Sequence, residues 1–512
     1  MAERRPNILL LFTDQQRYDT IAALGNAVIR TPALDRLCRE GVAFERCYTP
    51  SPVCVPGRAS MVTGLPPHRN GCFDNGYPVD PGLPSFMEKL AERGYQTHGV
   101  GKMHFTPEAR RMWGFASRDV SEEMGRADDF RKFIDAHGYA HVDDRHGVRS
   151  EMYYIPQVSQ LPAELHETHW VADRSIDFLE RRDRGRPFFL WSSFVKPHPP
   201  FENPTPWNKL YRAAEMAAPF RPEGFEKLQS FWNHVQNRYK YRGHGYDEML
   251  MRTIRAAYYA CISFIDHNVG RILATLGDEL DNTLVLFSSD HGELLGDYGC
   301  VGKRSMLDAA VRVPMLVRFP GRARAGQRCE RPVSLLDVWP TVLAAAGTVA
   351  GAGAEEARVC DEGADLAAVA DGGVAREAVY SQYQCGGLGL YMATTRDEKY
   401  IYSAADEREW FFDLKRDPRE TRDLAANPQC RGRVEAMRAR LIERFKRDGY
   451  EEAIEDHGWR RYGKRRVEPG TDRGLLFQDN AVTQQRIDGL EGYARPIGAD
   501  ADPLRDLLEG DS

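Results

Sequence analysis

The residue types best suited to chemistry gather in one short stretch, Cys54-Val55-Pro56-Gly57-Arg58, which stands directly ahead of a predicted helix. A cysteine placed where a loop meets a helix N-terminus lies near free backbone N–H groups, which favour anions. The stretch therefore predicts a reactive side chain beside an anion site. A buried structural cysteine next to a turn is the alternative interpretation of the same residues.

Two further polar pairs, Asp14-Gln15 and Asp290-His291, supply two carboxylates, an amide oxygen and an imidazole. Oxygen-rich ligand sets suit hard cations such as Ca²⁺, Mg²⁺ or Mn²⁺. Taken alone, each pair is equally compatible with a turn at the end of a strand. A Cys54 thiolate in such a set is a mismatch in softness, which leaves two alternatives. Either the ion is Zn²⁺ and the thiolate is a true ligand, or the cysteine is not the final chemical species.

The elements that must position these residues alternate between strands and helices from residue 7 to residue 319. Apolar runs predict buried strands, and apolar stripes at helical spacing predict helices, the longest over 248–276. We also expect Thr31 to cap the helix that starts at Pro32. The predicted strands are 7–12, 42–47, 95–100, 187–195, 283–287 and 315–319, and the predicted helices are 32–41, 84–93, 170–182 and 248–276. This order predicts an α/β fold with a mostly parallel sheet flanked by helices.

The carboxyl ends of parallel strands meet at one edge of a sheet, and ligands bind beyond that edge. Four of the predicted strands are followed by polar residues that could do chemistry. These are Asp14, then Lys102 with His104, then His198, and finally Asp290 with His291. We therefore expect all of them at the same edge.

The chain divides into three predicted parts: a catalytic α/β domain over 1–375, a smaller C-terminal α+β subdomain over 376–450, and an irregular tail over 451–512. A Gly/Ala-rich stretch over 344–373 precedes the subdomain and has the composition of a loop or connection. Short strands over 378–384, 390–395 and 400–403 and a helix over 431–445 form the subdomain. The tail could wrap over the body or join a neighbouring copy, which would make a homo-oligomer.

Composition describes an ordinary globular protein: 512 residues, 42% hydrophobic, with a formal net charge of −6. That charge gives no reason to expect nucleic acid, and the one basic run, Arg460–Arg466, is typical of a solvated segment. Ten cysteines are scattered singly, as in reduced proteins of the cytosol. The apolar run at 8–12 is too short for a signal peptide or a membrane span. We therefore expect a cytoplasmic protein without membrane partners.

Five motifs together resemble the type I sulfatases. The match includes the opening strand that ends in Asp14, and its motifs occur in the family's order from the first strand to about residue 420. The motifs are Cys54-x-Pro56-x-Arg58, Gly101-Lys102-Met103-His104, Lys196-Pro197-His198-Pro199-Pro200-Phe201, Ser289-Asp290-His291-Gly292-Glu293 with Gly302-Lys303, and the segment 410–418. The resemblance implies the fold of the alkaline phosphatase superfamily. It also implies that Cys54 is oxidised to formylglycine (3-oxoalanine) by a formylglycine-generating enzyme, and that the hydrated aldehyde is the nucleophile.

The resemblance also implies roles. Asp14, Gln15, Asp290, His291 and the modified Cys54 would hold one divalent cation, Ca²⁺ in the first place, with Mn²⁺ or Mg²⁺ as alternatives. Arg58 would stabilise the attacking oxygen, while Lys102 and Lys303 would neutralise the sulfuryl oxygens. His198, with Lys303, would protonate the leaving oxygen, and His104 would take the proton that releases sulfate and restores the aldehyde. Asn75 would bind substrate, although Asn75-Gly76 is also an ordinary turn signal.

One departure leaves the preferred anion open. Many sulfatases have a second aspartate where this chain has Gln15, and an asparagine where it has His291. The Gln and His forms resemble those of bacterial phosphonate monoester and phosphodiester hydrolases, and of some bacterial sulfatases. We therefore predict a sulfuric ester hydrolase acting on a small-molecule sulfate ester, with phosphonate or phosphodiester hydrolysis as the alternative. A metal-binding module with an unmodified Cys54 is a third reading, and the set of acid–base residues argues against it. Aryl sulfates, sulfated sugars and choline sulfate are all candidate substrates.

Overall fold

An eight-stranded sheet forms the centre of the computed structural model, which describes residues 5–123, 128–149, 152–241, 246–347, 361–374 and 376–467. Its strands, in spatial order, are β12 (Gln327–Cys329), β2 (Val42–Phe44), β11 (Met315–Arg318), β9 (Thr283–Ser289), β1 (Asn7–Thr13), β7 (Phe188–Ser193), β4 (Gln96–Gly101) and β5 (Ser117–Val120). β11 is antiparallel to both of its neighbours, and the other pairs are parallel. The predicted mostly parallel sheet is therefore confirmed.

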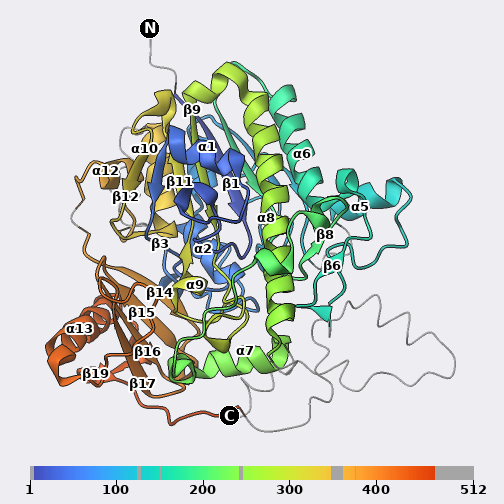
Figure 1. Ribbon diagram of the computed structural model, residues 1–512. Coiled ribbons are helices and arrows are strands. Elements are labelled where there is room, and N and C mark those ends of the chain that lie inside the picture. The colour runs from blue at the N-terminus through green and yellow to red at the C-terminus, as the bar shows by residue number, and fades with distance from the viewer. Residues whose placement is uncertain are drawn as a thin grey trace.

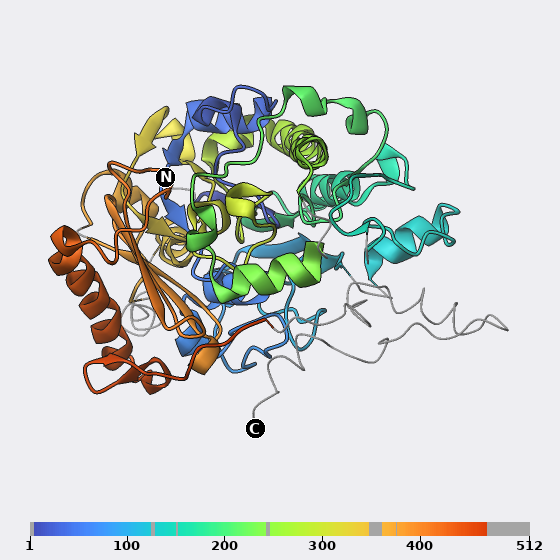
Figure 2. The ribbon, with the colours of Figure 1, turned by 60° about the horizontal axis from the view of Figure 1, so that its bottom comes forward.

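Helices cover both faces of this sheet (Figures 1 and 2). Successive side chains of β1 point to opposite faces: Ile8, Leu10 and Phe12 belong to one buried cluster, and Leu9 and Leu11 to another. The first face packs against α2 (Cys54–Thr63), α4 (Phe86–Glu92) and α10 (Val338–Ala346), and the second against α1 (Pro32–Glu40), α6 (Glu167–Arg181) and α8 (Glu248–Leu276). Because both faces are buried, β1 has the continuous apolar run that predicted it.

Shorter elements complete the first part of the chain. They are α3 (Pro67–Asn70), α5 (Asp129–Ala136), α7 (Phe231–Tyr241), α9 (Asp308–Val311) and α12 (Leu366–Ala370), with the small strands β3 (Cys47–Tyr48), β6 (Gln157–Val158), β8 (Glu202–Asn203), β10 (Arg312–Val313) and β13 (Val333–Ser334). No helix within the described ranges combines the length and apolarity that a membrane span requires.

The capping prediction for α1 is wrong. The Thr31 side chain does not cap the helix; its hydroxyl accepts from the Ala22 N–H and donates to Asp35. The first free N–H groups of α1, those of Ala33 and Leu34, instead donate to the Asp266 carboxylate of α8, at 3.1 and 2.8 Å. A cap supplied from a distant helix leaves no local signal in the sequence.

A four-stranded antiparallel sheet and α13 (Arg431–Arg447) form the C-terminal subdomain, coloured orange to red in Figure 1. The strands are β14 (Val379–Tyr383), β15 (Leu390–Thr394), β16 (Glu398–Ser403) and β17 (Arg408–Asp413). The beginning of the predicted irregular tail forms a small hairpin, β18 (Ile454–Glu455) with β19 (Gly458–Trp459). Residues 468–512 lie outside the described residues, so the oligomer predicted through this tail stays a prediction, as do the domain bounds 1–375, 376–450 and 451–512.

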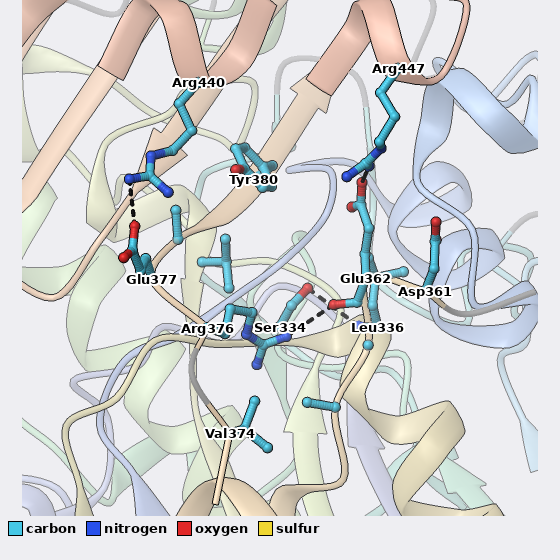
Figure 3. A pocket seen from close by; sticks show the side chains of 14 residues that line it. Ser334, Leu336, Asp361, Glu362, Val374, Arg376, Glu377, Tyr380, Arg440 and Arg447 are labelled. Atoms are coloured by element: carbon cyan, nitrogen blue, oxygen red, sulfur yellow. Dashed lines mark hydrogen bonds and ion pairs between the residues drawn. The ribbon is translucent and has the colours of Figure 1, made fainter. Parts of the chain in front are cut away.

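Buried charged residues are among the contacts that join the subdomain to the main body. Lys399 of β16 is fully buried and pairs with Asp308 of α9 and with Glu420, whose carboxylate lies 2.5 Å from the Lys399 ammonium. We call Asp308, Lys399 and Glu420 the interface triad. A cavity of about 460 Å³ lies at the same boundary, and two ion pairs line it, Arg440 with Glu377 and Arg447 with Glu362 (Figure 3).

Candidate active site

Cys54 is the first residue of α2 and is fully buried. The residue before it, Val53, cannot cap the helix, and the Val55 N–H donates instead to the Asn75 side-chain oxygen at 3.0 Å. The helix also approaches the end of β9 closely. A Cβ at Gly57 would lie 3.2 Å from the Asp290 carbonyl oxygen, so glycine permits this approach. The sequence thus places position 54 against the carboxyl edge of the sheet.

The residues predicted to bind a cation do converge on Cys54. Ligand atoms of Asp14, Cys54, Asp290 and His291 all lie within 4.8 Å of one another, and all four side chains are buried. The Cys54 sulfur lies 3.6 Å from the Asp14 carboxylate and 3.2 Å from His291 Nε2. Asp14 directly follows β1, and Asp290 and His291 directly follow its parallel neighbour β9, so these residues emerge at the same edge of the sheet.

Gln15 tests whether this site suits a hard cation. Its amide nitrogen donates to Glu293, which also accepts from the Tyr154 hydroxyl at 3.0 Å. That orientation leaves Gln15 Oε1 buried and without a hydrogen-bond partner among the described residues. A buried acceptor without a donor costs free energy unless a ligand satisfies it. An orphaned amide oxygen beside two carboxylates and an imidazole fits a divalent cation.

Three cationic side chains surround the same centre. Lys303 Nζ lies 2.8 Å from the Cys54 sulfur, Lys102 Nζ lies 2.5 Å from Asp14, and Arg58 Nε lies 2.8 Å from Asp290. Arg58 also donates to the Ser193 hydroxyl at 2.9 Å and to the Lys102 carbonyl oxygen. All three cations are buried, so they are screened little by water and can hold an anion strongly.

These charges shift the ionisation of the central residues. Burial and the Asp14 charge raise the pKa of the Cys54 thiol, but Lys303, Lys102 and His291 outweigh them and lower it overall. Burial also acts to raise the pKa of Asp14, and Lys102, His198, Lys303 and Arg58 hold it well below its usual range. Position 54 is therefore a place where negative charge is stabilised.

The predicted acid–base residues border this cluster. His198 lies with Nε2 3.5 Å from the Tyr153 hydroxyl, and burial together with Lys303 keeps its pKa well below the usual value. His104 has a positive φ of 55°, and burial and Lys102 lower its pKa to about 3, so it is neutral and able to accept a proton. No described hydrogen bond joins His104 to Cys54. Asn75 contacts the helix that carries Cys54, as noted above.

Sequence analysis missed Glu123, Arg149 and Ser193 at this edge. Glu123 pairs with Lys102, lies 3.6 Å from His198 Nδ1, and pairs with Arg149 at 2.9 Å. Ser193 ends β7 and holds Arg58. Glu123 follows β5, an edge strand of sequence Ser-Arg-Asp-Val that has no apolar run, so this strand was not predicted. Once β5 is known, the rule that polar residues follow strand ends finds Glu123.

Comparisons with known proteins identify the family. The family model "Sulfatase" matches residues 6–348, and the model "N-sulphoglucosamine sulphohydrolase, C-terminal" matches residues 296–447. The chain is 30% identical to an arylsulfatase of Clostridium perfringens, over 88% of this chain and 96% of the relative. It is also 30% identical to the multifunctional alkaline phosphatase superfamily protein PehA of Trinickia caryophylli, over 83% and 92%. The solved phosphonate monoester hydrolase of Agrobacterium radiobacter aligns with a TM-score of 0.74 at 25% identity, over 86% of this chain and 96% of that one.

Proposed function

The chain belongs to the sulfatase family and hydrolyses sulfate esters, and we propose that it does so around Cys54, through a formylglycine hydrate and a divalent cation. One observation carries this proposal. Two carboxylates, an imidazole and three cations meet at one buried side chain, which begins a helix at the carboxyl edge of the sheet. The Cys54 sulfur marks the place that the oxygens of the oxidised side chain would take.

Asp14, Gln15, Asp290 and His291 are the residues that would hold the cation, together with the modified residue 54. When bound, a divalent cation lowers the pKa of an oxygen it ligates and neutralises anionic oxygens of the substrate. We place Ca²⁺ first because the site offers oxygens from two carboxylates and an amide, with Mn²⁺ and Mg²⁺ as alternatives.

The chain's own residues then divide the remaining work. Lys102 and Lys303 bind the anionic ester oxygens in a site that is already ordered, so charge is stabilised without rearrangement. Arg58 orients Asp290 and adds positive charge beside position 54. His198 faces the leaving oxygen and, with Lys303, supplies its proton. An anionic ester bound beside His198 would raise its pKa, which burial and the neighbouring cations hold down in the free site. His104, neutral in the free site, accepts the proton whose removal frees sulfate.

The alternative function, hydrolysis of phosphonate monoesters or phosphodiesters, is favoured by Gln15 and His291 at the cation site and by the similarity to a phosphonate monoester hydrolase. A rate comparison separates the two. We expect higher kcat/KM on 4-nitrophenyl sulfate than on the phenyl phosphonate ester with the same leaving group. A preference for the phosphonate would overturn the sulfate assignment and leave the site assignment standing.

Peptide mass spectrometry of residue 54 tests the nucleophile. Co-expression with a formylglycine-generating enzyme should convert the Cys54 thiol to the aldehyde, and activity should rise with the converted fraction. Full activity of a preparation in which every Cys54 is a thiol would contradict the aldehyde. Metal analysis of the same preparation identifies the ion.

A cytoplasmic location completes the proposal. The nine cysteines among the described residues are all unpaired, which is typical of a reducing compartment. The partners we expect are the sulfate ester and the maturing enzyme, with neither nucleic acid nor a membrane.

A further inference from the structure

Lys196 is a fully buried charged residue to which sequence analysis gave no role. It lies two residues before His198, and 1% of its surface is exposed. Its ammonium has three protons and three acceptors: the Pro200 carbonyl oxygen at 2.7 Å, the His146 carbonyl oxygen at 3.0 Å and the Glu202 carboxylate at 3.2 Å. The hydrogen bond from the Lys196 ammonium to the Pro200 carbonyl oxygen joins the two ends of the loop 196–200, which contains His198.

A second buried residue, Glu202, neutralises the charge of the Lys196 ammonium. Glu202 accepts from His166 Nε2 at 2.8 Å, and His166 Nδ1 accepts from the Thr168 N–H at the start of α6. Burial acts to raise the pKa of Glu202, but His166 and Lys196 lower it to about 2, so Glu202 is ionised and neutralises the ammonium. The loop is thereby anchored to α6 through one charge pair.

The same loop is joined to the cation site by its backbone. The Lys196 carbonyl oxygen accepts from the Asp14 N–H at 3.4 Å, and the His198 N–H donates to Val195 at 3.2 Å. His198 Nδ1 lies 2.6 Å from the Pro199 carbonyl oxygen, which can only accept, so Nδ1 carries the proton. Nε2 is then the nitrogen that faces the Tyr153 hydroxyl and the site.

We infer that Lys196 is a positioning residue for His198: its ammonium, neutralised by Glu202, holds the loop so that Nε2 of His198 reaches the leaving oxygen of the substrate. The inference rests on the role proposed above for His198. Lys196 itself touches neither the substrate nor the reacting atoms. Proton donation matters most when the departing alcohol is a poor leaving group. Loss of Lys196 should therefore act selectively on such substrates.

The test is a series of aryl sulfates whose phenols span a wide range of pKa, measured with wild type, K196M and H198A. For the poorest leaving groups we expect K196M to lower kcat/KM by about 10²-fold, the usual contribution of general acid catalysis. For 4-nitrophenyl sulfate we expect a loss below about fivefold, because a good leaving group needs little protonation. H198A should show the same steepened dependence, and the double variant should be no worse than H198A alone. Equal losses across the series, or losses that multiply in the double variant, would overturn the inference.

K399M is the matched control, since Lys399 is an equally buried and ion-paired lysine outside the site. It should leave the leaving-group dependence unchanged. E202Q, which keeps the side-chain shape and removes the charge, gives a second measurement if K196M folds poorly; we expect the same steepening at a smaller size, and a wild-type dependence would count against the inference. If wild type prefers phosphonate esters, the sulfate assignment fails, and the same phenols in a phosphonate series still test Lys196.

Discussion

Two buried clusters of charge lie on either side of the segment 303–308, and they differ in how completely they are satisfied. In the interface triad, Lys399 pairs with Asp308 and Glu420 and donates to the Met306 carbonyl oxygen at 3.1 Å, while Arg312 adds a second cation 3.2 Å from Asp308. Its charges cancel. At the sheet edge, three cations face two carboxylates of the cation site, and the Gln15 oxygen has no described donor.

This difference distinguishes a cluster that holds the subdomain in place from a cluster that can bind a substrate. A set of ion pairs in which every group has a partner has no free group to bind a ligand. Breaking such a set lowers the free energy of unfolding. A set that includes a buried acceptor without a described donor retains the capacity to bind a ligand, and its charges are already ordered, which is the preorganisation that catalysis requires. Lys303 connects the two regions, because the segment that carries it is held at Met306 and Asp308 by the subdomain.

C54A is the variant with the largest expected effect on this comparison. It removes the side chain at the centre of the cluster at the sheet edge, and we expect turnover to fall by at least about 10⁴-fold, as for loss of a nucleophile. Thermal stability should change little. C430A is the matched control, a buried cysteine in the subdomain, and it should keep its activity. Retained turnover in C54A would remove position 54 from the mechanism.

K399M tests the interface triad. It leaves the Asp308 and Glu420 charges buried without their shared cation, which costs about 3–5 kcal/mol of unfolding free energy. Chemical denaturation measures this loss. Activity per folded molecule should fall less than about tenfold, because the described partners of Lys399 are Asp308, Glu420 and the Met306 carbonyl oxygen, none of which belongs to the active site. A large loss of rate at unchanged stability would show that the triad belongs to the site.

The pH dependence of the unfolding free energy, measured for wild type and E420Q, tests the protonation of Glu420 in the interface triad. Burial raises the pKa of the Glu420 carboxyl from its usual 4.5 to about 7. The folded protein therefore holds this proton more tightly than the unfolded chain. The resulting stability is complete below about pH 4.5 and is lost as the pH rises through about 7, by at most about 3 kcal/mol. E420Q should reduce this part of the pH dependence, whereas E435Q, at an exposed position of α13, should not. Identical curves for both variants would contradict the assignment.

N75A should have the smallest effect. Asn75 contacts the Val55 N–H at the start of α2, and losing such a cap costs about 1 kcal/mol. If that energy is felt at position 54, kcat/KM falls by about fivefold. N75D keeps the accepting oxygen and should recover the cap. A loss above about a hundredfold in N75A would instead place Asn75 in direct contact with the substrate.

Local sequence determined the elements and the composition of the site. Continuous apolar runs at 7–12 and 283–287 predicted strands that are buried on both faces, and the polar residues directly after them were found at one edge. Those relations depend only on neighbours in the chain, so they can be read from it.

Only the tertiary structure decided which distant residues meet. The cap of α1 by Asp266, the pairing of Glu123 with Lys102 and Arg149, and the hold of Lys196 on Pro200 and Glu202 each depend on packing between separate elements. A charged side chain is as compatible with solvent as with a buried partner until the fold removes the water around it. That desolvation, which no single stretch of sequence specifies, separates a surface lysine from one that positions an active-site loop.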